Sequence, residues 1–191
     1  MTVATTAAHA DQHATRRASI NQLGLWLFFL SESFLFCGLA SSRFYLAGAT
    51  TPSDVNQVLG LAITSILLLS SFTAYNAEAA IARGDRATFL RFIRWTILLG
   101  LVFVGGVAIE WSTAEFGPKD PYGTAFFTMT GIHASHVISG IGMLGLVYYL
   151  GKRGHFSAES HWGVEGVIKY WHFVDVVWVF FYPVLYLINW R

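Results

Sequence analysis

Charged residues are scarce in this sequence. Asp, Glu, Lys and Arg make up 12% of its 191 residues, whereas soluble domains carry roughly a quarter. Hydrophobic residues make up 54% of the chain, and 16% of the chain is aromatic. This balance excludes a soluble globular domain and is typical of a membrane protein. The net charge of only +1 gives no basic surface, so no nucleic-acid partner is expected.

The sequence also lacks the signatures of several enzyme classes. Cys37 is its only cysteine, so the chain has no CxxC or CxxCH motif and can form no internal disulfide. It has no Walker loop for nucleotide phosphates and no glycine-rich dinucleotide-binding turn. Nucleotide-dependent, thiol-redox and c-type haem chemistry are therefore not predicted for this chain.

Five long apolar runs take the place of these motifs. Each reaches the roughly 20 residues that a helix, rising about 1.5 Å per residue, needs to cross about 30 Å of hydrocarbon. The predicted spans are residues 21–46, 55–79, 93–114, 123–150 and 167–190. The first run is too long for the apolar core of a cleaved signal peptide. The sequence predicts an all-α membrane protein: a flexible cytoplasmic tail at residues 1–17 and a bundle of five transmembrane helices at residues 18–191.

Positive charges are unevenly divided between the two sets of loops. Nine lie on the side of the N-terminus: Arg16, Arg17, Arg83, Arg86, Arg91, Arg94, Lys152, Arg153 and Lys169. Three lie on the other side: Arg43, Lys119 and Arg191. By the positive-inside rule, the N-terminus is predicted to be cytoplasmic and the C-terminus outside.

Glu32 lies near the middle of the first predicted span. An ionisable residue at that depth costs about 2.5–3.5 kcal/mol on insertion scales and needs a partner. Its neighbours on the same helix face are apolar: Phe28, Phe29, Leu35 and Phe36. Two interpretations stay open: a protonated glutamate hydrogen-bonded to a neighbouring helix, or a functional residue on a proton or gas pathway.

Glu78 and Glu110 lie closer to the ends of their spans. Glu78 is expected at the interface, paired with an arginine of the loop at residues 83–86, where charges are tolerated. Glu110 closes the third span and is a weaker functional signal than Glu32. Glycines at Gly100, Gly105 and Gly106 are expected to let neighbouring helices approach the third span closely. The aromatic residues at the ends of the fifth span are expected to form an interfacial belt: Tyr170, Trp171, Tyr186 and Trp190.

Histidines raise the question of a metal or haem site. His133 and His136 share one face of the fourth span, and His172 and Asp175 lie one turn apart in the fifth. An H-x-x-H pair can contribute to a metal site, and paired histidines can hold haem, but either needs further ligands. The two spans run in opposite directions, which places His133 near mid-membrane and His172 near the cytoplasmic end. No metal site is therefore predicted.

Several segments together are similar to those of a known family. They are Gly-Thr-Ala-Phe-Phe at residues 123–127, Gly-Ile-His-Ala-Ser-His-Val at 131–137, and Tyr-Trp-His-Phe-Val-Asp-Val-Val-Trp at 170–178. These segments resemble subunit III of haem-copper terminal oxidases. Ser-Glu-Ser-Phe-Leu-Phe at residues 31–36 resembles the family's S-E-x-x-F-F helix, and the loop at 84–86 and Glu110 fall at matching places. The five spans resemble the short bacterial form rather than the seven-span long form.

The resemblance implies a non-catalytic accessory subunit of a proton-pumping oxidase, which reduces oxygen to water in aerobic respiration with cytochrome c or quinol as donor. The implied partners are subunit I by direct packing, subunit II, a small subunit IV and membrane lipids. Haems and copper are expected in partner subunits, none in this chain, and bound phospholipid is expected. The implied location is the bacterial inner membrane.

The resemblance also assigns roles to individual residues. Glu32 becomes a candidate for a lipid cleft or an oxygen path. The remaining candidates become polar ties that hold the bundle and its partner: Glu78, Glu110, His133, His136, His172 and Asp175. No catalytic residue and no metal ligand is expected.

Departures from the family pattern keep two alternatives open. Ile132, Ala134 and Ser135 replace residues of the common Gly-Phe-His-Gly-Leu-His stretch, and Trp111-Ser112 follows Glu110 in place of two tyrosines. The chain also lacks the two helices that complete the long form's lipid cleft. One alternative is an accessory subunit of a nitric oxide reductase. The other is an independent ion transporter, which would typically show internal repeats or broken helices.

Overall fold

The computed structural model describes residues 2–52 and 55–189, with side chains from Ser19 onward. Its elements are α1 (Thr2–Ala47), α2 (Gln57–Ala82), α3 (Arg86–Thr113), α4 (Pro121–Lys152), α5 (Trp162–Tyr182) and a short π-helix, η1 (Pro183–Leu187). The described residues contain no strand. Each of the five helices includes a segment that is long and apolar enough to cross a membrane. The predicted all-α fold with five spans is confirmed.

The observed helices differ from the predicted spans mainly at their ends. α1 begins at Thr2, so it runs through residues that the sequence assigns to a tail, although its apolar segment begins at Ser19. α5 begins at Trp162, five residues before the predicted start at residue 167. A span predicted from hydropathy stops where the polar residues begin, whereas a helix continues into them.

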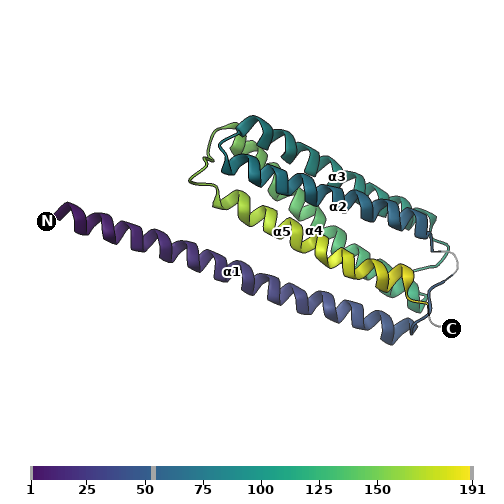
Figure 1. Cartoon of the computed structure of the whole chain (residues 1–191). Helices are drawn as coiled ribbons and strands as arrows, with labels where there is room; N and C mark the ends of the chain where they lie inside the picture. Colours follow the sequence, from purple (N-terminus) through teal and green to yellow (C-terminus); the bar gives the residue numbers. More distant parts are fainter. Residues whose placement is uncertain (1, 53–54, 190–191) are drawn as a thin grey trace. The chain divides into compact units, whose positions relative to one another are not determined.

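The chain divides into two compact units between Phe36 and Cys37. The first unit consists of most of α1. In the second, α2 packs against α3 and α5, and α4 packs against α3 and α5. These four helices lie side by side in Figure 1. All of the candidate residues except Glu32 belong to the second unit.

Local sequence signals account for several helix ends. The side chain of Asn56 accepts a hydrogen bond from the backbone N–H of Leu59 (2.9 Å) at the start of α2. Asp85 accepts one from the N–H of Thr88 (3.0 Å) at the start of α3, and both are preferred capping residues. Hydrogen bonds from the side chain and the backbone of Thr88 hold the pKa of the Asp85 carboxyl below its ordinary value.

The end of α5 has an unusual backbone. Pro183 starts η1, in which the N–H of Ile188 donates to the carbonyl oxygen of Pro183 (3.0 Å). This bond spans five residues instead of the four of an α-helix, a geometry found mostly as single turns. The wider turn carries Leu185 and Tyr186 into the core, where both are fully buried.

Trp171 joins four helices at the centre of the second unit. It is 1% exposed, and its indole N–H donates to the hydroxyl of Ser70 on α2 (2.9 Å). Its ring lies so close to Gly100 of α3 and Gly140 of α4 that a Cβ at either glycine would be less than 3.0 Å from it. Trp171 is therefore a core residue, not the member of an interfacial belt that the sequence predicts.

Candidate functional site

Three groups of polar side chains are buried within the helices of the second unit. The first joins α5 to α2. Asp175, which is 3% exposed, accepts a short hydrogen bond from the hydroxyl of Ser71. The same hydroxyl oxygen lies 3.0 Å from Nδ1 of His172. Because a hydroxyl has one proton, which Ser71 gives to Asp175, the Nδ1–H of His172 donates to Ser71.

This arrangement differs from the direct pairing of His172 with Asp175 that helix spacing suggests. Ser71 bridges the two side chains, so both are connected to α2 instead of only to each other. Ser71 lies 104 residues before Asp175, and nothing in its local sequence distinguishes it from the neighbouring serines of α2. The second oxygen of Asp175, Oδ1, is buried and has no hydrogen-bond partner among the described residues.

The second group surrounds His133 on α4. Its side chain is fully buried, with ring centroids 4.7 Å from Trp178 and 5.7 Å from Phe103. His136 is partly buried, and its Nδ1 lies 2.8 Å from the carbonyl oxygen of Ile132 in the same helix. His133 therefore packs among aromatic rings and His172 among hydroxyl and carboxyl groups. The structure does not bring them into one cluster, and no group of three His, Cys, Asp or Glu side chains suited to a metal occurs in the described part of the chain.

The third group lies where α3 ends. Glu110 is 4% exposed, and its Oε2 accepts a hydrogen bond from the hydroxyl of Tyr186 (2.7 Å). Tyr186 is fully buried against Gly60 of α2, where a Cβ would lie 2.7 Å from the tyrosine ring. Tyr122 lies nearby and donates to the carbonyl oxygen of Leu185 (2.6 Å). The tyrosine that the sequence places in an interfacial belt is thus the partner of a buried carboxylate.

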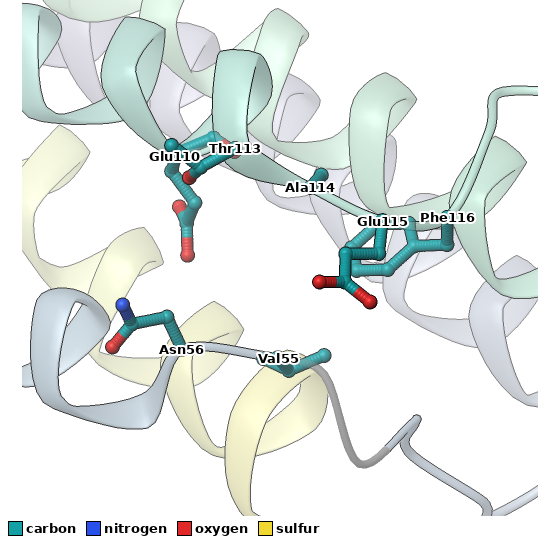
Figure 2. Close-up of a pocket in the computed structure, with 7 residues that line it drawn as sticks. All are labelled: Val55, Asn56, Glu110, Thr113, Ala114, Glu115 and Phe116. Carbon is teal, nitrogen blue, oxygen red and sulfur yellow. The ribbon is translucent and has the colours of Figure 1, made fainter.

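A pocket of about 270 Å³ opens beside Glu110. Its lining comes from the start of α2, the end of α3 and the segment after α3: Val55, Asn56, Glu110, Thr113, Ala114, Glu115 and Phe116. Figure 2 shows the carboxylate of Glu110 pointing toward Asn56, with the carboxylate of Glu115 on the same side of α3. The lining includes two acidic side chains and no basic one.

Arg43, one of the three positive charges on the side opposite the N-terminus, is buried. It is 0% exposed. Its guanidinium donates to the carbonyl oxygens of Gly48 and Thr50 and to the hydroxyl of Thr51, and it lies 5.4 Å from the ring centroid of Tyr122. A lone arginine just before a Gly-Ala-Thr-Thr-Pro loop is the available sequence signal, because arginine often binds the free carbonyl groups that follow a helix.

Glu78 and Glu32 complete the candidates. Glu78 is partly buried in α2, and it forms no ion pair with an arginine among the described residues. Arg86 donates instead to the carbonyl oxygens of Gly151 and Lys152, and the pairing of Glu78 with that loop stays a prediction. Glu32 lies within the apolar segment of α1. The hydroxyl of the adjacent Ser33 donates a hydrogen bond to the carbonyl oxygen of Phe29, one turn earlier in the same helix (2.7 Å).

Comparison with known proteins identifies the family. Residues 2–190 match the family model described as cytochrome c oxidase subunit III. Cytochrome c oxidase subunit 3 of Thermostichus vulcanus is 33% identical over 189 residues, which cover 95% of this chain and 94% of that protein.

Two vertebrate relatives are longer than this chain. Cytochrome c oxidase subunit 3 of Scyliorhinus canicula and that of Gallus gallus are each 35% identical over 176 residues, which cover 85% of this chain and 67% of theirs. The vertebrate proteins thus contain sequence beyond the matched part. The chain belongs to the cytochrome c oxidase subunit III family.

Proposed function

We propose that this chain is the accessory subunit of a proton-pumping haem-copper terminal oxidase that reduces oxygen to water. The match to the family over residues 2–190 carries this proposal. The chain packs directly against subunit I and stabilises it, with subunit II and a small subunit IV as further partners. The haems and copper belong to the partner subunits, and the complex lies in the bacterial inner membrane.

The buried polar groups divide into two roles under this proposal. Those of α2 to α5 act as ties that keep the helices in register, so that the bundle offers a constant surface to its partner. The hydrogen bonds of Asp175 and Glu110 to side chains on other segments support this role. Glu32 takes part in lipid binding, oxygen access or proton uptake. Its position within an apolar span supports this role.

Purification with an affinity tag on this chain tests the proposal. In mild detergent, the tagged chain is expected to bring with it larger polypeptides and the absorption spectrum of haem. Oxygen consumption by that complex supports an oxidase, whereas consumption of nitric oxide without oxygen reduction indicates a nitric oxide reductase. A colourless chain that is stable alone contradicts both assignments and favours an independent transporter.

Substitution of Glu32 tests its proposed role. Glu32→Gln keeps the size of the side chain and one acceptor oxygen, but it replaces the other oxygen with an NH2 group and removes the ability to ionise. We expect normal recovery of the complex and a normal initial rate, followed by a faster decline of activity during turnover. Ser33→Ala is the matched control, because it alters the adjacent residue, whose hydroxyl bonds within its own helix. If Glu32→Gln prevents assembly, the residue is structural.

A further inference from the structure

One oxygen of the buried Glu110 carboxyl has no hydrogen-bond partner among the described residues. Oε2 accepts the hydroxyl of Tyr186, but Oε1 is buried without a donor. A carboxylate oxygen removed from water destabilises the structure unless a donor or a cation compensates it. The pocket beside Glu110 is where such a group has room (Figure 2).

The other charges around this pocket are negative. Glu115 adds a second carboxylate, and it is exposed, so it can turn toward a ligand. α3 ends at Thr113, and the last carbonyl groups of a helix have no partner within it and carry the negative end of its dipole. At the start of α2, the N–H groups of Gln57 and Leu59 already donate to the carbonyl oxygen of Val55 and the side chain of Asn56.

Arg43, the buried cation at this end of the second unit, does not neutralise the pocket. Its guanidinium is occupied by the carbonyls of Gly48 and Thr50 and by the hydroxyl of Thr51. It forms no ion pair with Glu110 among the described residues. Among the residues that the structure describes, the carboxylates of the pocket therefore have no counter-ion.

We propose that this pocket binds a divalent metal cation of the Ca²⁺ or Mg²⁺ type. Oε1 of Glu110 and the carboxylate of Glu115 are the charged ligands, and the hydroxyl of Thr113 is a neutral oxygen donor beside them. Such cations take oxygen ligands and commonly keep several waters, for which a volume of about 270 Å³ has room. The absence of imidazole and sulfur from the lining argues against zinc and copper.

This site adds to the proposed function and does not depend on it. The cation is not a redox centre. Its ligands are not the histidines that the sequence offers for a metal site, His133, His136 and His172. The cation joins Glu110 at the end of α3 to Glu115 after it. The expected effect of the bound cation is to fix the segment after α3 against the end of that helix.

Terbium luminescence tests the site directly. Tb³⁺ replaces Ca²⁺ at oxygen sites and emits when a nearby aromatic ring is excited, and Tyr186 is hydrogen-bonded to Glu110. The protein is purified in its natural assembly, washed with chelator and titrated with Tb³⁺. We expect saturable emission that Ca²⁺ or Mg²⁺ displaces. Glu115→Gln is expected to raise the apparent Kd for Tb³⁺ about tenfold, because affinity follows the number of charged ligands.

Matched variants make the test specific. Glu110→Gln is expected to weaken binding at least as much as Glu115→Gln does. Replacement of the buried Glu110 can also affect folding, so the variant of the exposed residue, Glu115→Gln, decides the test. Glu159→Gln is the control, since it removes an exposed acid from the loop between α4 and α5, and it should leave the titration unchanged. No saturable emission, or emission unaffected by Glu115→Gln, overturns the proposal.

Discussion

Ser71 shows how much a single hydroxyl can do in a membrane bundle. It accepts from His172 and donates to Asp175, so one small side chain on α2 provides for two ionisable residues of α5. The alternative for those residues is an unpartnered polar group in an apolar interior, which is strongly unfavourable. The stability of the contact between α2 and α5 therefore depends on a residue that is neither charged nor large.

Replacement of this serine gives the first prediction for the second unit. Ser71→Ala removes the hydrogen bond that the Ser71 hydroxyl donates to the carboxyl of Asp175, and it should destabilise the bundle by about 1–3 kcal/mol, the usual range when a buried polar group loses its partner. The readout is the temperature at which the purified complex loses this chain. Ser65→Ala is the control, because Ser65 is an exposed serine of α2 whose hydroxyl bonds to Leu61 of its own helix (2.8 Å). Equal melting of the two variants would contradict the bridging role.

Which residues are ionisable and buried could be predicted from the sequence, but not which atoms they meet. A carboxylate in an apolar run can be recognised from the sequence alone, so Asp175 and Glu110 are predicted to need partners. Their partners, Ser71 and Tyr186, lie 104 and 76 residues away. Serine and tyrosine also have common alternative roles, in backbone hydrogen bonds and at the interface. Only packing selects between these roles.

At the scale of helices, close packing is concentrated at particular glycines. Gly100 lies against Trp171, and Gly106 lies against Ile63, but nothing lies within 4 Å of the Cβ position at Gly105. The prediction that the third span allows close approach is right for two of its three glycines. The third faces away from the other helices of its unit, a difference that composition alone does not reveal.

The contrast between two of these glycines can be tested by adding one methyl group. At Gly100, a Cβ would lie 2.7 Å from Cη2 of Trp171, whose ring is held by Ser70 and fully buried. Gly100→Ala should therefore destabilise the bundle by about 1–3 kcal/mol, as overpacked cores do. Gly105→Ala should be neutral or slightly stabilising, since alanine favours helix more than glycine does. The measurement is the thermal stability of the two variants in the same detergent. A similar loss of stability in both would contradict the close contact of Trp171 with Gly100 as the cause.

The cap of α3 predicts a pH dependence. In the folded protein, hydrogen bonds from Thr88 lower the pKa of Asp85, so the cap stabilises the protein above the ordinary aspartate pKa of about 3.9 and the contribution fades as the pH falls through the lower folded value. Asp85→Ala should lower thermal stability at neutral pH, with a smaller difference from the original protein in acid. Asp85→Asn is the control, since asparagine also caps helices but does not titrate there. A difference that is constant with pH would contradict this assignment.

At the scale of the whole molecule, the loops of the second unit form two opposite ends. At one end, Arg86 binds the carbonyl oxygen of Gly151 (2.8 Å), and Phe89 packs against Phe156. At the other end, Thr51 donates to the carbonyl oxygen of Ile188 (2.8 Å). The number of spans and the grouping of these loops follow from hydropathy, because length and apolarity are local properties of the chain. The orientation in the membrane follows from charge and stays a prediction.

Cysteine labelling tests that orientation. In a Cys37→Ser background, Lys119→Cys places one thiol in the loop after α3, and Ser157→Cys places one in the loop after α4. A membrane-impermeant maleimide applied to intact cells should label the first variant, whereas the second should react only after the membrane is opened. Labelling after opening shows in each case that the thiol is accessible within the complex. The reverse pattern would place the N-terminus outside.

The π-helical turn after Pro183 has a consequence for how this chain tolerates changes in length. The turn is closed by a hydrogen bond that spans five residues, so removal of one residue between Pro183 and Tyr186 would change the direction in which the tyrosine points. Its hydroxyl would then leave Glu110, even though every functional group was still present. Deletion of Val184 would thus break the hydrogen bond between Tyr186 and Glu110, as a mutation of Glu110 itself would. The count of residues in this turn is itself part of the site.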